Sequence, residues 1–133
     1  MSIIIPGTED VEKLQKRFSE ALGDEYQVEM YTEVSSSFFF SKKNVFDLVI
    51  FRNNIPFVGI EYKGVARSIH IELKPEWFYS KFQEVNLKYG IYYFGKENQF
   101  YLWSKGEYRF QVFDFASIIN AIKQDVPVGE RLC

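Results

Sequence analysis

Two apolar segments joined by a pair of asparagines constrain the fold of this chain more than any other feature of its sequence. The first segment covers residues 45–51 (VFDLVIF) and the second covers residues 56–63 (PFVGIEYK). Between them lie Asn53 and Asn54, a residue type that tolerates the backbone of a tight turn. The pattern therefore predicts a β-hairpin.

Helical and strand-like segments flank this hairpin on both sides. Apolar residues at helical spacing predict a helix over about 9–22, and Gly23 is a plausible end for it. A strand-like composition follows over 26–40. After the hairpin, the sequence predicts a helix that begins near Pro75, with Tyr89 on one face and Gly90 at its end; strands over 91–94, 100–103 and 108–113; and a short helix over 115–122. This order describes a compact α+β or α/β domain.

Composition limits the class of protein. A chain of 133 residues that is 47% hydrophobic and 26% charged is typical of one globular domain, and its 25 aromatic residues (14 Phe, 9 Tyr and 2 Trp) can fill a dense core. The net charge of −2 argues against a strongly cationic nucleic-acid binder, although it leaves room for a local basic groove. No uncharged stretch approaches the roughly 20 apolar residues of a membrane span. With Cys133 as its single cysteine, the chain is expected in the cytoplasm, away from membranes.

Two acidic residues stand out because each interrupts an apolar strand. An ionised carboxylate in the position of Asp47 or Glu61 is costly unless it is paired or bound to a cation. Lys63 follows Glu61 by two residues, so both lie on one face of the strand. Carboxylates can hold a hard cation such as Mg²⁺ or Mn²⁺, and a lysine beside it can orient or deprotonate a water. The pattern indicates metal-assisted hydrolysis of a phosphodiester.

The register of the hairpin decides whether the two acids share a face. A two-residue turn over Asn53 and Asn54 would place Asp47 opposite Ile60 and direct Glu61 to the other face. Such a register would destroy the site.

A three-residue loop over 52–54 would bring the acids together. It would pair Phe51 with Ile55 and place Asp47 opposite Gly59, diagonal to the second acid. We therefore expect an odd loop of this kind or an equivalent β-bulge.

The motif Asp47-x13-Glu61-x-Lys63, carried across a hairpin between helices, resembles the PD-(D/E)xK nuclease superfamily. Residues 46–63 (FDLVIFRNNIPFVGIEYK) look particularly like the N-terminal nuclease region of type I restriction enzyme motor subunits. The resemblance implies an α/β fold with a restriction-endonuclease-like core, in which helices flank a mixed β-sheet and a C-terminal antiparallel aromatic meander extends it. We expect a single domain over 1–133, with a core of about 9–104 and a last strand and helix over 107–124.

The resemblance also implies roles for individual residues. Asp47 and Glu61 would be metal ligands that take part in catalysis, the main-chain carbonyl of Tyr62 would complete the metal shell, and Lys63 would be the catalytic lysine. Two further candidates are a first-helix glutamate, with Glu12 preferred over Glu20, and Lys81, on the helix expected beside the site.

The function that these expectations favour is divalent-metal-dependent hydrolysis of DNA phosphodiester bonds, with Mg²⁺ or Mn²⁺ as cofactor. The partner would be nucleic acid, DNA rather than RNA, and a homodimer would be the simplest way to cut both strands. One alternative is an inactive nuclease-fold domain that acts as a nucleic-acid- or protein-interaction subunit. Another is a plain structural domain, which predicts Asp47 buried in a salt bridge with Lys63.

Overall fold

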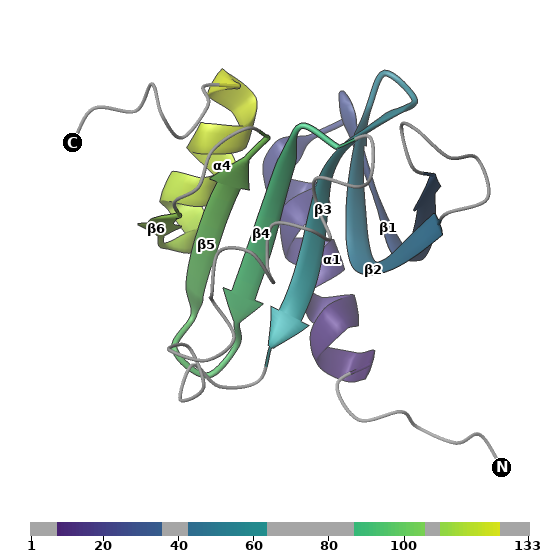
Figure 1. Cartoon of the computed structure of the whole chain (residues 1–133). Helices are drawn as coiled ribbons and strands as arrows, with labels where there is room; N and C mark the ends of the chain where they lie inside the picture. Colours follow the sequence, from purple (N-terminus) through teal and green to yellow (C-terminus); the bar gives the residue numbers. More distant parts are fainter. Residues whose placement is uncertain (1–7, 36–42, 64–86, 106–109, 126–133) are drawn as a thin grey trace, which may run out of the picture.

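The computed structural model describes residues 8–35, 43–63, 87–105 and 110–125 (Figure 1). Within these residues the elements are α1 (Thr8–Leu22), β1 (Tyr26–Ser35), β2 (Lys43–Arg52), β3 (Ile55–Lys63), β4 (Tyr89–Phe94), β5 (Gln99–Ser104), β6 (Gln111–Phe113) and α4 (Phe115–Gln124). Neither of the two described helices is long and apolar enough to cross a bilayer.

The strands form one mixed sheet in the order β1-β2-β3-β4-β5-β6. Only β3 and β4 pair in parallel, and every other neighbouring pair is antiparallel. Because parallel strands run in the same direction, β3 and β4 end on the same side of the molecule. The mixed α/β sheet and the antiparallel β4–β5–β6 meander agree with the sequence-based expectation, while the domain bounds stay a prediction.

Both described helices pack against the same face of the sheet (Figure 1). The apolar stripe of α1 supplies Val11, Leu14, Phe18 and Leu22 to the main core, and α4 supplies a second set of side chains from residues 118–122. The first helix ends as predicted, because Gly23 takes a φ of 87° and its N–H bonds back to the Ser19 carbonyl.

A second cluster of buried side chains belongs to the opposite face of the sheet. It contains Phe46, Val49, Leu87, Tyr92, Phe94 and Trp103. The aromatic residues of the meander are thus mainly core, as their number predicts; Tyr93 stacks on Phe100 with ring centroids 4.4 Å apart, and its hydroxyl donates to Asn98.

The hairpin loop differs from the expected three-residue loop. Asn53 and Asn54 form a two-residue turn in which both φ angles are positive, 54° and 64°, and Arg52 pairs with Ile55. This combination defines a type I′ turn, which matches the twist of the two strands.

A β-bulge then shifts the register. Phe51 pairs with Pro56, but the next residue, Ile50, pairs with Val58, so one extra residue lies on β3. The expected pairings of Phe51 with Ile55 and of Asp47 with Gly59 are therefore wrong, while the alternative, an equivalent bulge, is confirmed.

The bounds of other helices and strands also differ from those expected from the sequence. Tyr89 and Gly90, expected at the end of a helix, lie in β4, where Tyr89 is opposite Val58. Leu87 and Lys88 are not helical either, and residues 75–86 of that expected helix fall outside the described residues. Phe110 lies outside the last strand, residues 108–109 of the expected strand fall outside the described residues, and the last helix extends two residues beyond 122, to Gln124.

Candidate functional site

The β2–β3 register brings the two strand acids to one place. Val49 pairs with Gly59 and Leu48 with Ile60, where the β2–β3 ladder ends; extending this register by one position aligns Asp47 with Glu61. Opposite residues of an antiparallel pair share a face of the sheet. Both side chains are half-buried. The bulge therefore restores the common face that an uninterrupted two-residue turn would have removed.

The Asp47 carboxylate is held by the backbone of β3. Its Oδ2 accepts a hydrogen bond from the Tyr62 N–H at 2.8 Å. A side-chain oxygen thus takes the place of a main-chain acceptor on β2, a strand that bends along its length (Figure 1). The residue opposite Asp47 on β1, Tyr31, has a left-handed φ of 50°, which accompanies the bend.

The Tyr62 carbonyl lies on the same edge of β3 as this hydrogen bond. The Lys63 carbonyl accepts from the Gly95 N–H at 2.8 Å, so the backbone groups of Lys63 face β4. Successive residues of a strand direct these groups to opposite edges, and those of Tyr62 consequently face β2. The carbonyl is thus directed toward the strand that carries Asp47.

Lys63 is half-buried on the face opposite the helices. Strand alternation puts it on the same side as Glu61, and its ammonium lies 5.5 Å from the centroid of the Tyr92 ring. This distance allows a cation–π contact that orients the ammonium. Lys63 and Asp47 form no ion pair with one another, which argues against the plain structural alternative.

The remaining expected site residues either lie exposed on α1 or fall outside the described residues. Glu12 and Glu20 are exposed on α1, and Lys81 falls outside the described residues. The α1 acid that contacts β3 is Asp10, whose Oδ2 accepts a hydrogen bond from the Tyr62 hydroxyl at 3.1 Å. The described residues contain no cluster of three or more Asp, Glu, His or Cys side chains that could hold a metal, so a cation here would rely on two carboxylates and main-chain oxygen.

A small groove lies on the helical face of the same strand end. It has a volume of about 190 Å³ and is lined by Asp10, Lys13, Leu14, Arg17, Tyr62, Tyr93 and Gly95; we call it the α1 groove. Burial, followed by the hydrogen bond to Asp10, raises the pKa of the Tyr62 hydroxyl, so it remains a protonated donor at neutral pH.

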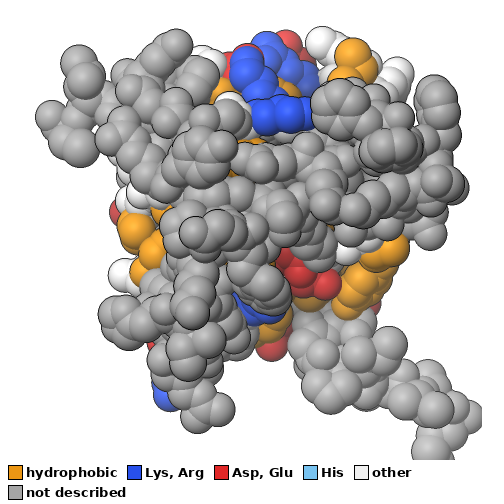
Figure 2. Space-filling model, viewed as in Figure 1, with side chains coloured by type: hydrophobic (Ala, Val, Ile, Leu, Met, Phe, Trp, Pro, Cys, Tyr) orange, Lys and Arg blue, Asp and Glu red, His pale blue; other side chains and the backbone are white. Residues whose placement is uncertain are grey.

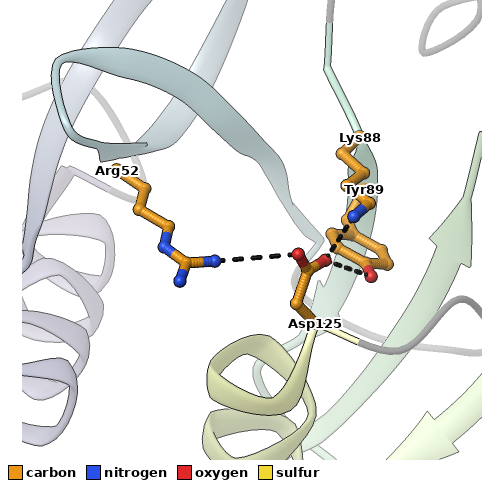
Figure 3. A network of polar contacts seen from close by, with 4 residues as sticks. All are labelled: Arg52, Lys88, Tyr89 and Asp125. Atoms are coloured by element: carbon orange, nitrogen blue, oxygen red, sulfur yellow. Dashed lines mark hydrogen bonds and ion pairs between the residues drawn. The ribbon is translucent and has the colours of Figure 1, made fainter.

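The other end of the sheet carries a network of paired charges (Figure 3). The carboxylate of Asp125, at the C-terminus of α4, lies 2.7 Å from the Lys88 ammonium and 3.7 Å from the Arg52 guanidinium, and it accepts a hydrogen bond from the Tyr89 hydroxyl at 2.7 Å. Burial alone would raise the pKa of Asp125, but these hydrogen bonds and charges outweigh it and hold that pKa below its usual value. Figure 2 shows basic side chains gathered with acidic ones at this end of the molecule.

Neither the α1 groove nor the charge network around Asp125 was predicted from the sequence. The cations of the α1 groove, Lys13 and Arg17, are four residues apart on a predicted helix, and this spacing was the available signal. The network could not be found in the same way, because its members come from β2, the start of β4 and the end of α4.

Comparison with known proteins supports the fold. No protein-family model matches the sequence, and no curated protein is similar to it in sequence. Among solved structures, the chain is similar to a protein from Anabaena variabilis ATCC 29413 described as a "putative nuclease belonging to DUF820". The two share 11% sequence identity with a TM-score of 0.57, and the match covers 86% of this chain and 71% of that one. This likeness establishes the fold alone, which is α/β with a restriction-endonuclease-like core, as predicted. The more specific resemblance to type I motor subunits stays a prediction.

Proposed function

We propose that this protein is a divalent-metal-dependent nuclease that hydrolyses DNA phosphodiester bonds at the end of β3. The observation that supports the proposal is the bulge-corrected register, which pairs Leu48 with Ile60 and, extended by one position, aligns Asp47 with Glu61. The nuclease-like fold supports the same conclusion. The inactive-domain alternative gives no reason for the bulge to align two half-buried carboxylates.

The donor set fits a hard cation. Asp47 and Glu61 would hold Mg²⁺ or Mn²⁺, and the Tyr62 carbonyl, which faces β2, would add a main-chain oxygen. When bound, the ion would supply Lewis acidity and lower the pKa of a water. The hydrogen bond from the Tyr62 N–H fixes one Asp47 oxygen and leaves the other oxygen to the cation.

Lys63 would act on the phosphate and on the attacking water. Its ammonium, held near the Tyr92 ring, places a positive charge on the face that also carries Glu61. Such a charge stabilises the negative charge that develops on a phosphodiester in the transition state. An amine in this position could also orient the water or accept its proton.

Cleavage assays on a matched pair of aspartate variants test the proposal. Purified protein is incubated with plasmid, linear and single-stranded DNA in Mg²⁺, Mn²⁺ or EDTA. We expect cleavage by the wild type in either metal and none in EDTA. Asp47→Ala should abolish cleavage, while Asp24→Ala, which changes an exposed aspartate, should cleave like the wild type. Equal cleavage by the two variants would overturn the assignment, and no metal-dependent cleavage by the wild type would favour the inactive-domain alternative.

A further inference from the structure

The α1 groove contains more positive than negative charge. Lys13 and Arg17 are one helical turn apart on α1 and both line it, against the single acid Asp10. Among the side chains that the structure describes, neither cation forms an ion pair. The Asp10 carboxylate already accepts the Tyr62 hydroxyl. The groove is therefore a local positive site on a chain whose net charge is −2.

The guanidinium of Arg17 is held in place before any ligand arrives. Its Cζ lies 4.2 Å from the centroid of the Phe115 ring, within the range of a cation–π contact. Ordering this long side chain beforehand reduces the entropy lost on binding. A planar fork of donors beside a flexible ammonium suits the oxygens of a phosphate.

The size of the groove limits what it can hold. Its volume of about 190 Å³ is below the roughly 300 Å³ at which pockets for whole small molecules begin. One chemical group of a larger ligand fits such a space better than a complete nucleotide. A backbone phosphate of a polynucleotide meets this condition, because the rest of the strand lies outside the groove.

Tyr62 connects the groove with the proposed active site. Its side chain lines the groove and donates to Asp10, while its N–H holds Asp47. Glu61 and Lys63, its neighbours in sequence, point to the other face of the sheet. The groove and the proposed active site therefore share the same end of β3 on opposite faces of the sheet, and a nucleic-acid strand anchored in the groove would reach the acids by passing around that end.

We propose that the α1 groove binds a backbone phosphate of the nucleic-acid substrate through Lys13 and Arg17. The inference rests on the proposed function and adds to it an anchoring contact that is separate from the metal ligands.

An assay of nucleic-acid binding in the absence of metal, and so of metal-dependent cleavage, tests the inference. Fluorescence anisotropy of a labelled single-stranded oligonucleotide is measured in EDTA, at salt concentrations from about 50 to about 200 mM. The Lys13→Gln/Arg17→Gln double variant should raise the Kd roughly tenfold at low salt. It should also reduce the slope of log K against log salt by about 0.7, the value for one phosphate on a single strand that is no longer neutralised.

Matched variants distinguish the contribution of the groove residues to binding from that of the overall charge of the protein. Lys16→Gln removes an exposed α1 cation that does not line the groove and should leave the Kd nearly unchanged. Asp10→Asn should lower the Kd, because it removes the one negative charge near the phosphate. Lys13→Gln alone, at an exposed position, provides the test if the loss of the Arg17 stacking prevents folding.

Three results would overturn the inference: equal Kd values for the double variant and Lys16→Gln, a raised Kd for Asp10→Asn, or a nucleoside monophosphate that binds as tightly as the oligonucleotide. Because the assay contains no metal, its outcome is independent of cleavage. Loss of binding in the double variant together with inactive wild-type protein would support the groove and reject the nuclease proposal.

Discussion

The two ends of the sheet use charged residues in different ways. Where β4 starts, Arg52 and Lys88 surround the carboxylate of Asp125, so opposite charges satisfy one another (Figure 3). Where β3 ends, the Asp47 carboxylate bonds to backbone and the Lys63 ammonium to an aromatic ring, without pairing with each other. Ion pairs of the first kind contribute to stability, whereas charged groups that do not pair with one another can interact with a ligand.

The largest expected effect is on the rate of DNA cleavage, and it depends on which of two lysines is removed. Lys63→Ala should lower the rate of DNA cleavage by about 10²–10⁴-fold, because a charge that acts in the transition state is lost. Lys88→Ala, at the opposite end, should leave the rate unchanged and lower the melting temperature instead. Cleavage rates and thermal unfolding of both variants check this. A Lys88 variant that cleaves as slowly as the Lys63 variant would show that the two ends do not differ in function.

The paired end should contribute more to stability than any single residue of the site. Asp125→Asn removes the charge that attracts Lys88 and Arg52 and weakens the hydrogen bond from Tyr89, at a cost of about 1 kcal/mol. The substitution suits the backbone, because φ is 55° at this position and asparagine tolerates it. Urea unfolding at neutral pH measures the loss. A stability equal to that of the wild type would mean that the network contributes nothing.

The same network predicts a pH dependence. The pKa of Asp125 is lower in the folded protein than its ordinary value, so its stabilising contribution is present above that ordinary value and is lost as pH falls through the folded pKa. From about pH 5 downward, the free energy of unfolding should fall more steeply for the wild type than for Asp125→Asn. Urea unfolding over this range tests it, and parallel curves would contradict the assignment.

The smallest expected effect is at the link between the groove and the site. Tyr62→Phe removes the hydrogen bond to Asp10 but keeps the N–H that holds Asp47. It should cost about 0.5–1 kcal/mol in unfolding free energy and leave cleavage nearly unchanged. A loss of cleavage as large as that of Lys63→Ala would show that the hydroxyl itself takes part in the reaction.

Much of the fold was predictable because local patterns determined it. Helical spacing of apolar residues identified α1 and α4, and the Asn53-Asn54 pair between apolar runs identified the hairpin. Local patterns also identified Asp47, Glu61 and Lys63 as residues that need a special environment, since charges in apolar strands are costly.

The register could be predicted only in part. Pro56, which has no N–H for the ladder, is a local signal for a bulge, but its position and the resulting pairing depend on how β3 packs between β2 and β4. Asp10, rather than Glu12, contacts β3 for a similar reason: the tilt of α1 on the sheet decides which α1 acid meets Tyr62. Long-range packing also explains why Tyr89 joined a strand despite its helical spacing.

The central claim is that Asp47 and Glu61 together form a cation site at the end of β3. Two nearby carboxylates repel one another, and a bound ion relieves that cost and stabilises the folded state. The most direct measurement is the shift in melting temperature caused by millimolar Mg²⁺ or Mn²⁺ in the wild type, Asp47→Asn and Asp125→Asn. We predict equal increases for the wild type and Asp125→Asn and a clearly smaller increase for Asp47→Asn. An increase in Asp47→Asn as large as that in the wild type would place the ion elsewhere and contradict the account.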